Sequence, residues 1–121
     1  MDEYALHVHI ASYLNFVIRE PDFWHSIEVS NQSGGVHAML RQQKLRKKGV
    51  VTGFPDIEIY HKVCKEFGYF KIIFLEIKTK AGKVSDKQKQ IHELLRRCGH
   101  SVYVVREIEE VRQILIKEGI I

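Results

Sequence analysis

Hydrophobic side chains recur along the chain with two periods, one typical of helices and one typical of strands. The helical period comes first, because Leu6, Ile10 and Leu14 would share one face of a helix. Asp2 can cap this helix, and Pro21 ends it. The chain is therefore expected to open with an amphipathic helix that packs one face against the core.

A short strand and a second helix are expected next. Side chains alternate over residues 24–30, and the polar, glycine-containing stretch 31–35 ends the alternation. Residues 36–48 then predict a helix that stops at Gly49. The apolar anchors of this helix are few, namely Met39, Leu40 and Leu45. The second helix is therefore expected to be held by a narrow apolar face.

Two further alternating stretches, 57–60 and 71–78, predict neighbouring strands joined by a loop over 61–70. In the second stretch both the even-numbered and the odd-numbered side chains are mostly apolar, which is typical of a central strand covered on both faces. The loop contains aromatic side chains that are expected to pack under the sheet edge or at a subunit contact, namely Phe67, Tyr69 and Phe70.

The rest of the chain predicts a helix, a strand and a final helix. Ser85 and Gln88 have the spacing of a capping box, and Gly99 ends the helix that they begin. Residues 101–106 form a valine-rich strand, reached by a right-handed crossover. The last helix has its apolar positions at Ile108, Val111, Ile114 and Leu115. The order helix, strand, helix, strand, strand, helix, strand, helix predicts one α/β domain over 1–121, with a mixed sheet flanked by helices.

Composition limits the class of protein. With 121 residues and 45% hydrophobic side chains, the chain suits one domain with a modest core. No apolar run approaches the ~20 residues that span a bilayer, and residues 1–20 lack a signal-peptide pattern, so an intracellular, cytoplasmic protein without a membrane partner is expected. Cys64 and Cys98 have no paired spacing and are expected as free, partly buried thiols.

The most unusual residues lie at the ends of the two central strands. Glu76 and Lys78 stand where a buried strand should carry apolar side chains, and charges are costly there unless they pair or bind an ion. Antiparallel pairing would bring Asp56 beside Glu76. These two carboxylates with the carbonyl of Ile77 would suit Mg²⁺ or Mn²⁺, which prefer oxygen ligands. The alternative is a simple ion pair of Glu76 with Lys78, which contributes about 0–1 kcal/mol.

These residues also carry a family resemblance. Pro55 and Asp56, followed by Glu76-x-Lys78, resemble the signature of the PD-(D/E)XK nucleases. More narrowly, residues 49–56 and 74–88 are similar to the VRR nuclease (VRR-NUC, virus-type replication and repair nuclease) domain, and the similarity covers about residues 36–115. It implies a restriction-endonuclease-like core and a nuclease that uses Mg²⁺ or Mn²⁺. In such an enzyme Lys78 would orient or help deprotonate the attacking water and neutralise phosphate charge.

The resemblance implies further site residues. Glu3 is the acid on the first helix that fits as an additional metal ligand, and an exposed first-turn glutamate fits this position equally well. Gln88 belongs to the family motif as well as to the capping box. Asn31 is interpreted as a turn residue or as a residue that approaches the phosphate backbone. The implied substrate is branched or structured DNA, such as four-way junctions or flaps in replication, repair or recombination, and the implied assembly is a homodimer.

The charge distribution agrees with a nucleic-acid partner. The net charge is +4, from 19 basic and 15 acidic residues, which favours a polyanion. Basic residues crowd both sides of the motif, and a solvated surface is the open alternative to phosphate contact. The residues expected to contact phosphate are Lys44, Arg46, Lys47, Lys48, Lys80 and Lys83.

Other interpretations of the polar residues and of the function stay open. Glu58 shares a strand face with Asp56 and is interpreted as a cross-strand partner of a lysine rather than a metal ligand. His7 and His9 point different ways on a helix, so zinc is not indicated, and the histidines are interpreted as ordinary surface and packing residues. A non-cleaving nucleic-acid-binding domain would not need the three charged motif residues together. An RNA-directed endonuclease would share them, because they address the phosphate.

Overall fold

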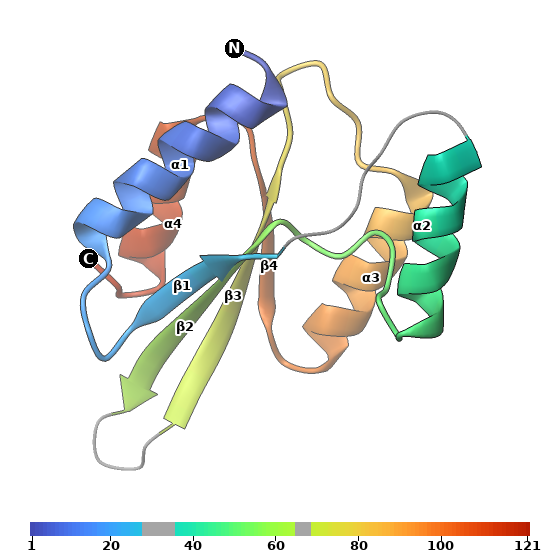
Figure 1. Cartoon of the computed structure of the whole chain (residues 1–121). Helices are drawn as coiled ribbons and strands as arrows, with labels where there is room; N and C mark the ends of the chain where they lie inside the picture. The colour runs from blue at the N-terminus through green and yellow to red at the C-terminus, as the bar shows by residue number, and fades with distance from the viewer. Residues whose placement is uncertain (28–35, 65–68) are drawn as a thin grey trace.

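A computed structural model describes residues 1–27, 36–64 and 69–121 of the chain. The helices and strands follow the order that the sequence predicts. They are α1 (Glu3–Val17), β1 (Phe23–Ser26), α2 (Val36–Lys47), β2 (Ile57–Cys64), β3 (Tyr69–Ile77), α3 (Asp86–Arg97), β4 (Ser101–Val105) and α4 (Ile108–Lys117). Figure 1 shows three layers, with α1 and α4 on one side of the sheet and α3 on the other. The predicted α/β sandwich is confirmed.

The sheet is mixed, and its strand order is β1-β2-β3-β4. β2 pairs antiparallel with both β1 and β3, whereas β3 and β4 run parallel. A parallel pair needs a crossover, and α3 supplies it between β3 and β4. β3 therefore has a neighbour on each side, and its residues 73–77 are buried. The prediction of a central strand covered on both faces is confirmed.

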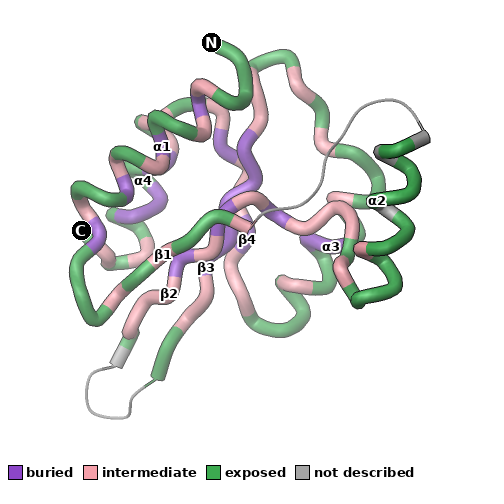
Figure 2. Tube along the Cα trace, in the orientation of Figure 1, coloured by how far each residue is buried: buried purple, intermediate pink, exposed green. Residues whose placement is uncertain are grey.

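The main core lies between the sheet and the helices α1 and α4. Ile73, Leu75 and Ile77 of β3 and the apolar faces of both helices are fully or almost fully buried there. In Figure 2 this buried zone runs along the middle of the sheet and the inner faces of α1 and α4. The largest contributors are Ile10, Leu14, Ile57, Ile59, Ile73, Leu75, Ile77 and Leu115. This core leaves the opposite face of β3, with Phe74 and Glu76, to α3.

Two strand boundaries differ from the sequence prediction. The expected loop over 61–70 is wrong at both ends, because the β2–β3 ladder continues from the pair His61 with Lys71 to the pair Cys64 with Tyr69. Backbone hydrogen bonds hold this part of the hairpin, and they do not require apolar alternation. β1 begins at Phe23, one residue earlier than predicted, and the expected continuation over 28–30 lies outside the described residues.

Several expected apolar contacts are also corrected. On α2, Met39 and Leu40 are 63% and 48% exposed, so they are not anchors, and only Leu45 is half-buried. Most of α2 is accordingly coloured as exposed in Figure 2. The thiol of Cys98 is exposed rather than partly buried, because it caps the C-terminus of α3 at the surface. The side chain of Cys64 lies outside the described part of the chain.

Gly53 is expected to be sensitive to substitution. Its φ is +86°, and a Cβ there would lie 3.0 Å from Lys87 Cγ and 3.2 Å from the backbone nitrogen of Gln88. Gly99 has a similar φ of +91° but no atom within 4 Å of a Cβ, which makes it a matched control. Gly99→Ala should cost about 1 kcal/mol of stability, and Gly53→Ala about 1–3 kcal/mol more, measured by urea unfolding. Equal losses would show that the loop before Asp56 does not pack on α3.

Candidate active site

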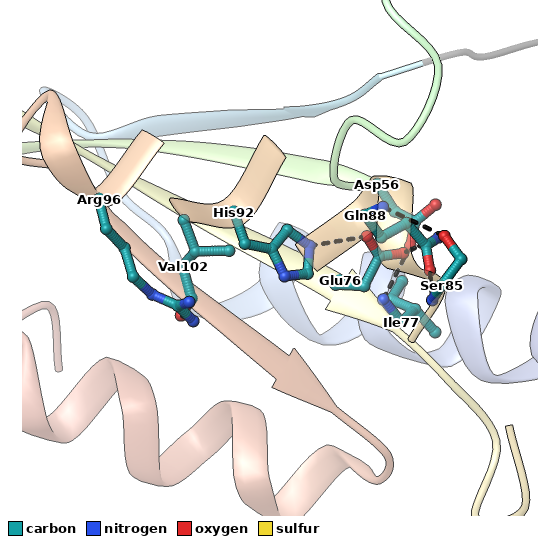
Figure 3. A network of polar contacts seen from close by, with 8 residues as sticks. All are labelled: Asp56, Glu76, Ile77, Ser85, Gln88, His92, Arg96 and Val102. Atoms are coloured by element: carbon teal, nitrogen blue, oxygen red, sulfur yellow. Dashed lines mark hydrogen bonds and ion pairs between the residues drawn. The ribbon is translucent and has the colours of Figure 1, made fainter. Parts of the chain in front are cut away.

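Asp56 is held at the start of β2 by the backbone of β3. The backbone nitrogen of Asp56 donates a hydrogen bond to the carbonyl of Leu75 at 3.0 Å. The backbone nitrogen of Ile77 donates to Asp56 Oδ2 at 2.7 Å. The pairing of Ile57 with Leu75 puts Asp56 opposite Glu76 in the ladder. The structure therefore brings together the two carboxylates that lie far apart in the sequence, as predicted, and Figure 3 shows them side by side.

Glu76 is almost completely buried, with an exposed fraction of 1%. Helix α3 reaches it with two side chains: Gln88 Nε2 lies 3.4 Å from Glu76 Oε2, and His92 Nε2 lies 3.1 Å from Glu76 Oε1. The first distance is at the long limit of a hydrogen bond, and the second is ordinary. Gln88 Oε1 at the same time accepts from the backbone nitrogen of Ser85 at 2.9 Å. Gln88 thus completes the predicted capping box and also faces the predicted site.

The environment of Glu76 disfavours its negative charge. Burial, followed by the hydrogen bond and the negative charge of Asp56, raises the pKa of Glu76 to about 9, although Lys78 lowers it. Two adjacent carboxylates, one of them buried, repel each other when both are ionised, and a bound cation would compensate this repulsion. Such a pair of hard oxygen donors suits Mg²⁺ or Mn²⁺, because Mg²⁺ commonly binds one or two carboxylates and retains several waters. The residues present therefore fit the predicted metal.

A cavity of about 550 Å³ opens beside these carboxylates. It contains four of the predicted catalytic and metal-binding side chains besides Glu76 itself, and it has polar walls formed by α1, the loop before β2, the end of β3 and α3. Its lining residues are Glu3, Tyr4, His7, Ile27, Gly53, Phe54, Asp56, Glu76, Lys78 and Gln88. Glu3 is exposed yet lies at this wall, so the first helix does reach the site.

The individual metal ligands stay predictions. Among the residues that the structure describes, no three His, Cys, Asp or Glu side chains are grouped closely enough to hold a metal ion together. Glu3 is therefore a neighbour of the carboxylate pair, and its role as a ligand stays a prediction. The role of the Ile77 carbonyl as a ligand also stays a prediction; the backbone nitrogen of Ile77 donates a hydrogen bond to Asp56. Asn31 lies outside the described residues.

The residues expected to contact phosphate are all on the surface, outside the cavity. Lys44, Arg46, Lys47 and Lys48 are exposed at the C-terminal end of α2. Lys80 and Lys83 are exposed in the turn between β3 and α3. Arg106 Nη1 fixes that turn by donating to the carbonyls of Thr79 and Gly82, each at 2.6 Å. The two basic groups are thus separate surfaces, and their contact with phosphate stays a prediction.

His92 and Glu58 have partners that differ from those of the sequence interpretation. His92 is 3% exposed and contacts Glu76, so its interpretation as an ordinary packing residue is wrong. Its position, four residues after Gln88 on the same helix face, was the available signal. Glu58 accepts from the Tyr60 hydroxyl at 2.8 Å and lies 2.7 Å from His25 Nε2. The predicted lysine partner of Glu58 is therefore wrong, because the neighbouring strand β1 presents a histidine there.

The chain is an α/β domain with a mixed four-stranded sheet, and in fold it is like the PD-(D/E)XK nucleases. Among solved structures, the chain is similar to one named "VRR_NUC domain protein", with a TM-score of 0.67 and 18% sequence identity over 98% of this chain and 88% of the other. It is also similar to one named "VRR_NUC domain", with a TM-score of 0.56 and 18% identity over 95% of this chain and 94% of the other. The predicted resemblance to the VRR nuclease domain is thus confirmed for the fold.

Searches by sequence do not add to this result. No family model matches the chain, and no curated protein matches it. The likeness therefore rests on the three-dimensional arrangement, at an identity that carries the fold and not the activity. Within residues 1–27, 36–64 and 69–121, no helix has both the length and the apolarity needed to cross a bilayer.

Proposed function

We propose that the protein is a divalent-metal-dependent nuclease that hydrolyses phosphodiester bonds of branched or structured DNA in replication, repair or recombination. The observation that carries the proposal is the pair of half-buried Asp56 and buried Glu76, which lines one cavity together with Lys78. The fold shared with solved VRR_NUC domains supports it. Two adjacent carboxylates, one of them buried, are costly to a stable domain, and they are useful where a cation binds.

The metal would be held by Asp56 and Glu76, with the Ile77 carbonyl and Glu3 as the further proposed ligands. When bound, a Mg²⁺ or Mn²⁺ ion supplies positive charge against the phosphate and makes a water more acidic. The protein itself holds the ligands in place. Hydrogen bonds from the Ile77 backbone and from α3 hold the two carboxylates in fixed positions. Fixed positions matter because a displaced catalytic group loses much of its effect.

Lys78 is proposed to act directly on the reacting atoms. It follows Glu76 by two residues, so its side chain leaves β3 on the same face and lines the same cavity. Its ammonium can offset the negative charge that develops on the phosphate and can orient the attacking water. In its neutral amine form, the same group could accept a proton from that water. Gln88 lines the cavity from α3 and has an amide that can position a water or a phosphate oxygen.

A cleavage assay tests the proposal. The protein is incubated with linear duplex, flap, four-way-junction and RNA substrates, each with Mg²⁺, with Mn²⁺ and with EDTA. Cleavage of branched DNA that requires a divalent ion is expected. Cleavage of RNA alone would favour the RNA-directed endonuclease. Binding that persists in EDTA, without cleavage under any condition, would favour the non-cleaving nucleic-acid-binding domain.

The basic end of α2 is proposed to bind the DNA backbone. Changing Arg46, Lys47 and Lys48 together to glutamine should weaken binding in EDTA and reduce the slope of log affinity against log salt by roughly 0.7–0.9 for each phosphate that is no longer neutralised. Fluorescence anisotropy at several salt concentrations measures both effects. The control changes Arg112 and Lys117 to glutamine on α4, which lies on the other side of the sheet, and it is compared with the charge-matched double change of Arg46 and Lys47. An equal loss in the control would show that net charge alone is responsible.

A homodimer is proposed with the nuclease. Phe23 is exposed and stacks on Tyr60 with a ring separation of 4.5 Å, and Tyr69 and Phe70 at the start of β3 are exposed as well. Tyr69 and Phe70 therefore do not pack under the sheet edge, and their use at a subunit contact stays a prediction; Phe67 lies outside the described residues. Exposed aromatic side chains are enriched at interfaces. Light scattering that gives the mass of one chain would remove this proposal.

A further inference from the structure

Helix α3 holds Glu76 through two side chains that are one helical turn apart. Gln88 approaches one carboxylate oxygen at 3.4 Å, and His92 approaches the other at 3.1 Å. His92 makes the shorter of the two contacts, and its side chain is buried. Gln88 lines the cavity, and its amide oxygen also accepts a hydrogen bond from the backbone nitrogen of Ser85. His92 is not among the residues that line the cavity. In Figure 3 its ring contacts Glu76 from the side opposite to Asp56 and Gln88. It is therefore placed to hold Glu76 and not to touch a substrate.

The position of His92 is itself fixed from both ends of α3. At the N-terminus, the capping box joins Ser85 and Gln88. At the C-terminus, Arg96 Nη2 donates to the carbonyl of Val102 at 2.9 Å, which ties the helix to β4. Since β4 pairs in parallel with β3, this hydrogen bond also fixes the helix relative to the strand that carries Glu76. The ring of His92 can therefore restrain the carboxylate without moving itself.

We propose that His92 is a positioning residue that sets the affinity of the Asp56–Glu76 pair for a divalent cation. The inference rests on the proposed function, because it concerns the same carboxylates. Groups that hydrogen-bond a metal-binding carboxylate orient it, and their loss commonly weakens metal binding by roughly tenfold to a hundredfold. When Glu76 is ionised, a neutral imidazole can donate to it from Nε2. An ionised Glu76 without this donor would be buried with one oxygen unsatisfied.

The test measures the affinity for Mn²⁺ by calorimetry on the whole chain, without nucleic acid. His92→Leu removes the donor and should weaken Mn²⁺ binding by roughly tenfold to a hundredfold. His92→Gln, whose amide nitrogen reaches about as far as Nε2, should restore most of the affinity. Ile91→Val is the matched control, because Ile91 is the neighbouring buried residue of α3 and its aliphatic side chain has no donor for Glu76. It should lower the unfolding temperature and leave Mn²⁺ affinity unchanged.

A second deletion covers the case in which His92→Leu does not fold. His92→Asn is polar, but its amide is too short to reach Glu76, and it should weaken Mn²⁺ binding as His92→Leu does. Equal Mn²⁺ affinity in the wild type and in a folded donor-deleted variant would overturn the inference and leave the nuclease proposal standing. Failure of the wild type to bind Mn²⁺ and to cleave any substrate would overturn both.

Discussion

Glu76→Gln is expected to lower the rate of phosphodiester cleavage by about a hundredfold to a thousandfold. The substitution keeps the size of the side chain and can keep the contact with His92, but it removes the negative charge that would bind the metal. Without a bound cation, the charge that develops on the phosphate is left to Lys78 alone. The single-turnover rate with the best DNA substrate and saturating Mg²⁺ measures the loss.

The chain offers a matched control for this prediction. Glu58 lies on the same strand face as Asp56, but it is bound to His25 and Tyr60 rather than to the carboxylate pair. Glu58→Gln should therefore retain cleavage within a few-fold, whereas Asp56→Asn should lose as much as Glu76→Gln. If both Asp56→Asn and Glu76→Gln cleave at the wild-type rate, the site lies elsewhere and the proposed function is wrong.

Much of this site could be predicted because two simple regularities determine it. Strand alternation assigns Glu76 and Lys78 to one face, and antiparallel pairing then places Asp56 opposite Glu76. Strand alternation and antiparallel pairing both follow from backbone geometry, so these two placements do not depend on how the side chains pack. The sequence predicts two roles for Gln88, and its amide is placed for both, because Oε1 accepts from the backbone nitrogen of Ser85 while Nε2 faces Glu76. The distances and the buried state of Glu76 needed the folded chain.

His92 shows how little the sequence pattern says about a single helix position, since its spacing from Gln88 is the one signal that it gives. One histidine on a helix face resembles many packing residues, and its partner Glu76 lies on another element. The packing of α3 on β3 decides which histidine meets Glu76. It places His92 against Glu76, whereas His100, which follows the helix, lies against the ring of Phe74. The extended hairpin is a similar case, because the ladder from His61 to Cys64 depends on backbone bonds that apolar periodicity does not report.

The same burial that prepares the site for a cation should make the metal-free protein less stable. The pKa of Glu76 is raised to about 9 from 4.5, so the folded chain binds a proton more tightly than the unfolded chain. The stabilisation from this proton is complete below about pH 4.5 and is lost as the pH rises towards 9.

Glu118 is the opposite case. Burial raises its pKa, but hydrogen bonds from Tyr103 and Lys71 outweigh burial and hold the pKa of Glu118 below its usual value.

In EDTA at pH 8, Glu76→Gln is therefore expected to stabilise the protein by about 1–3 kcal/mol, because the unfolded wild type gains stability from an ionised glutamate that the folded state disfavours. Glu118→Gln should instead destabilise it by about 1–3 kcal/mol, since it removes a buried carboxylate with two donors. Urea unfolding at pH 5 and pH 8 measures both changes in stability, and the stability gained by Glu76→Gln should shrink at pH 5.

Added Mn²⁺ should raise the stability of the wild type and not that of Glu76→Gln. A Glu76→Gln protein that is less stable than the wild type at pH 8 would show that the folded state tolerates the Glu76 charge without a metal.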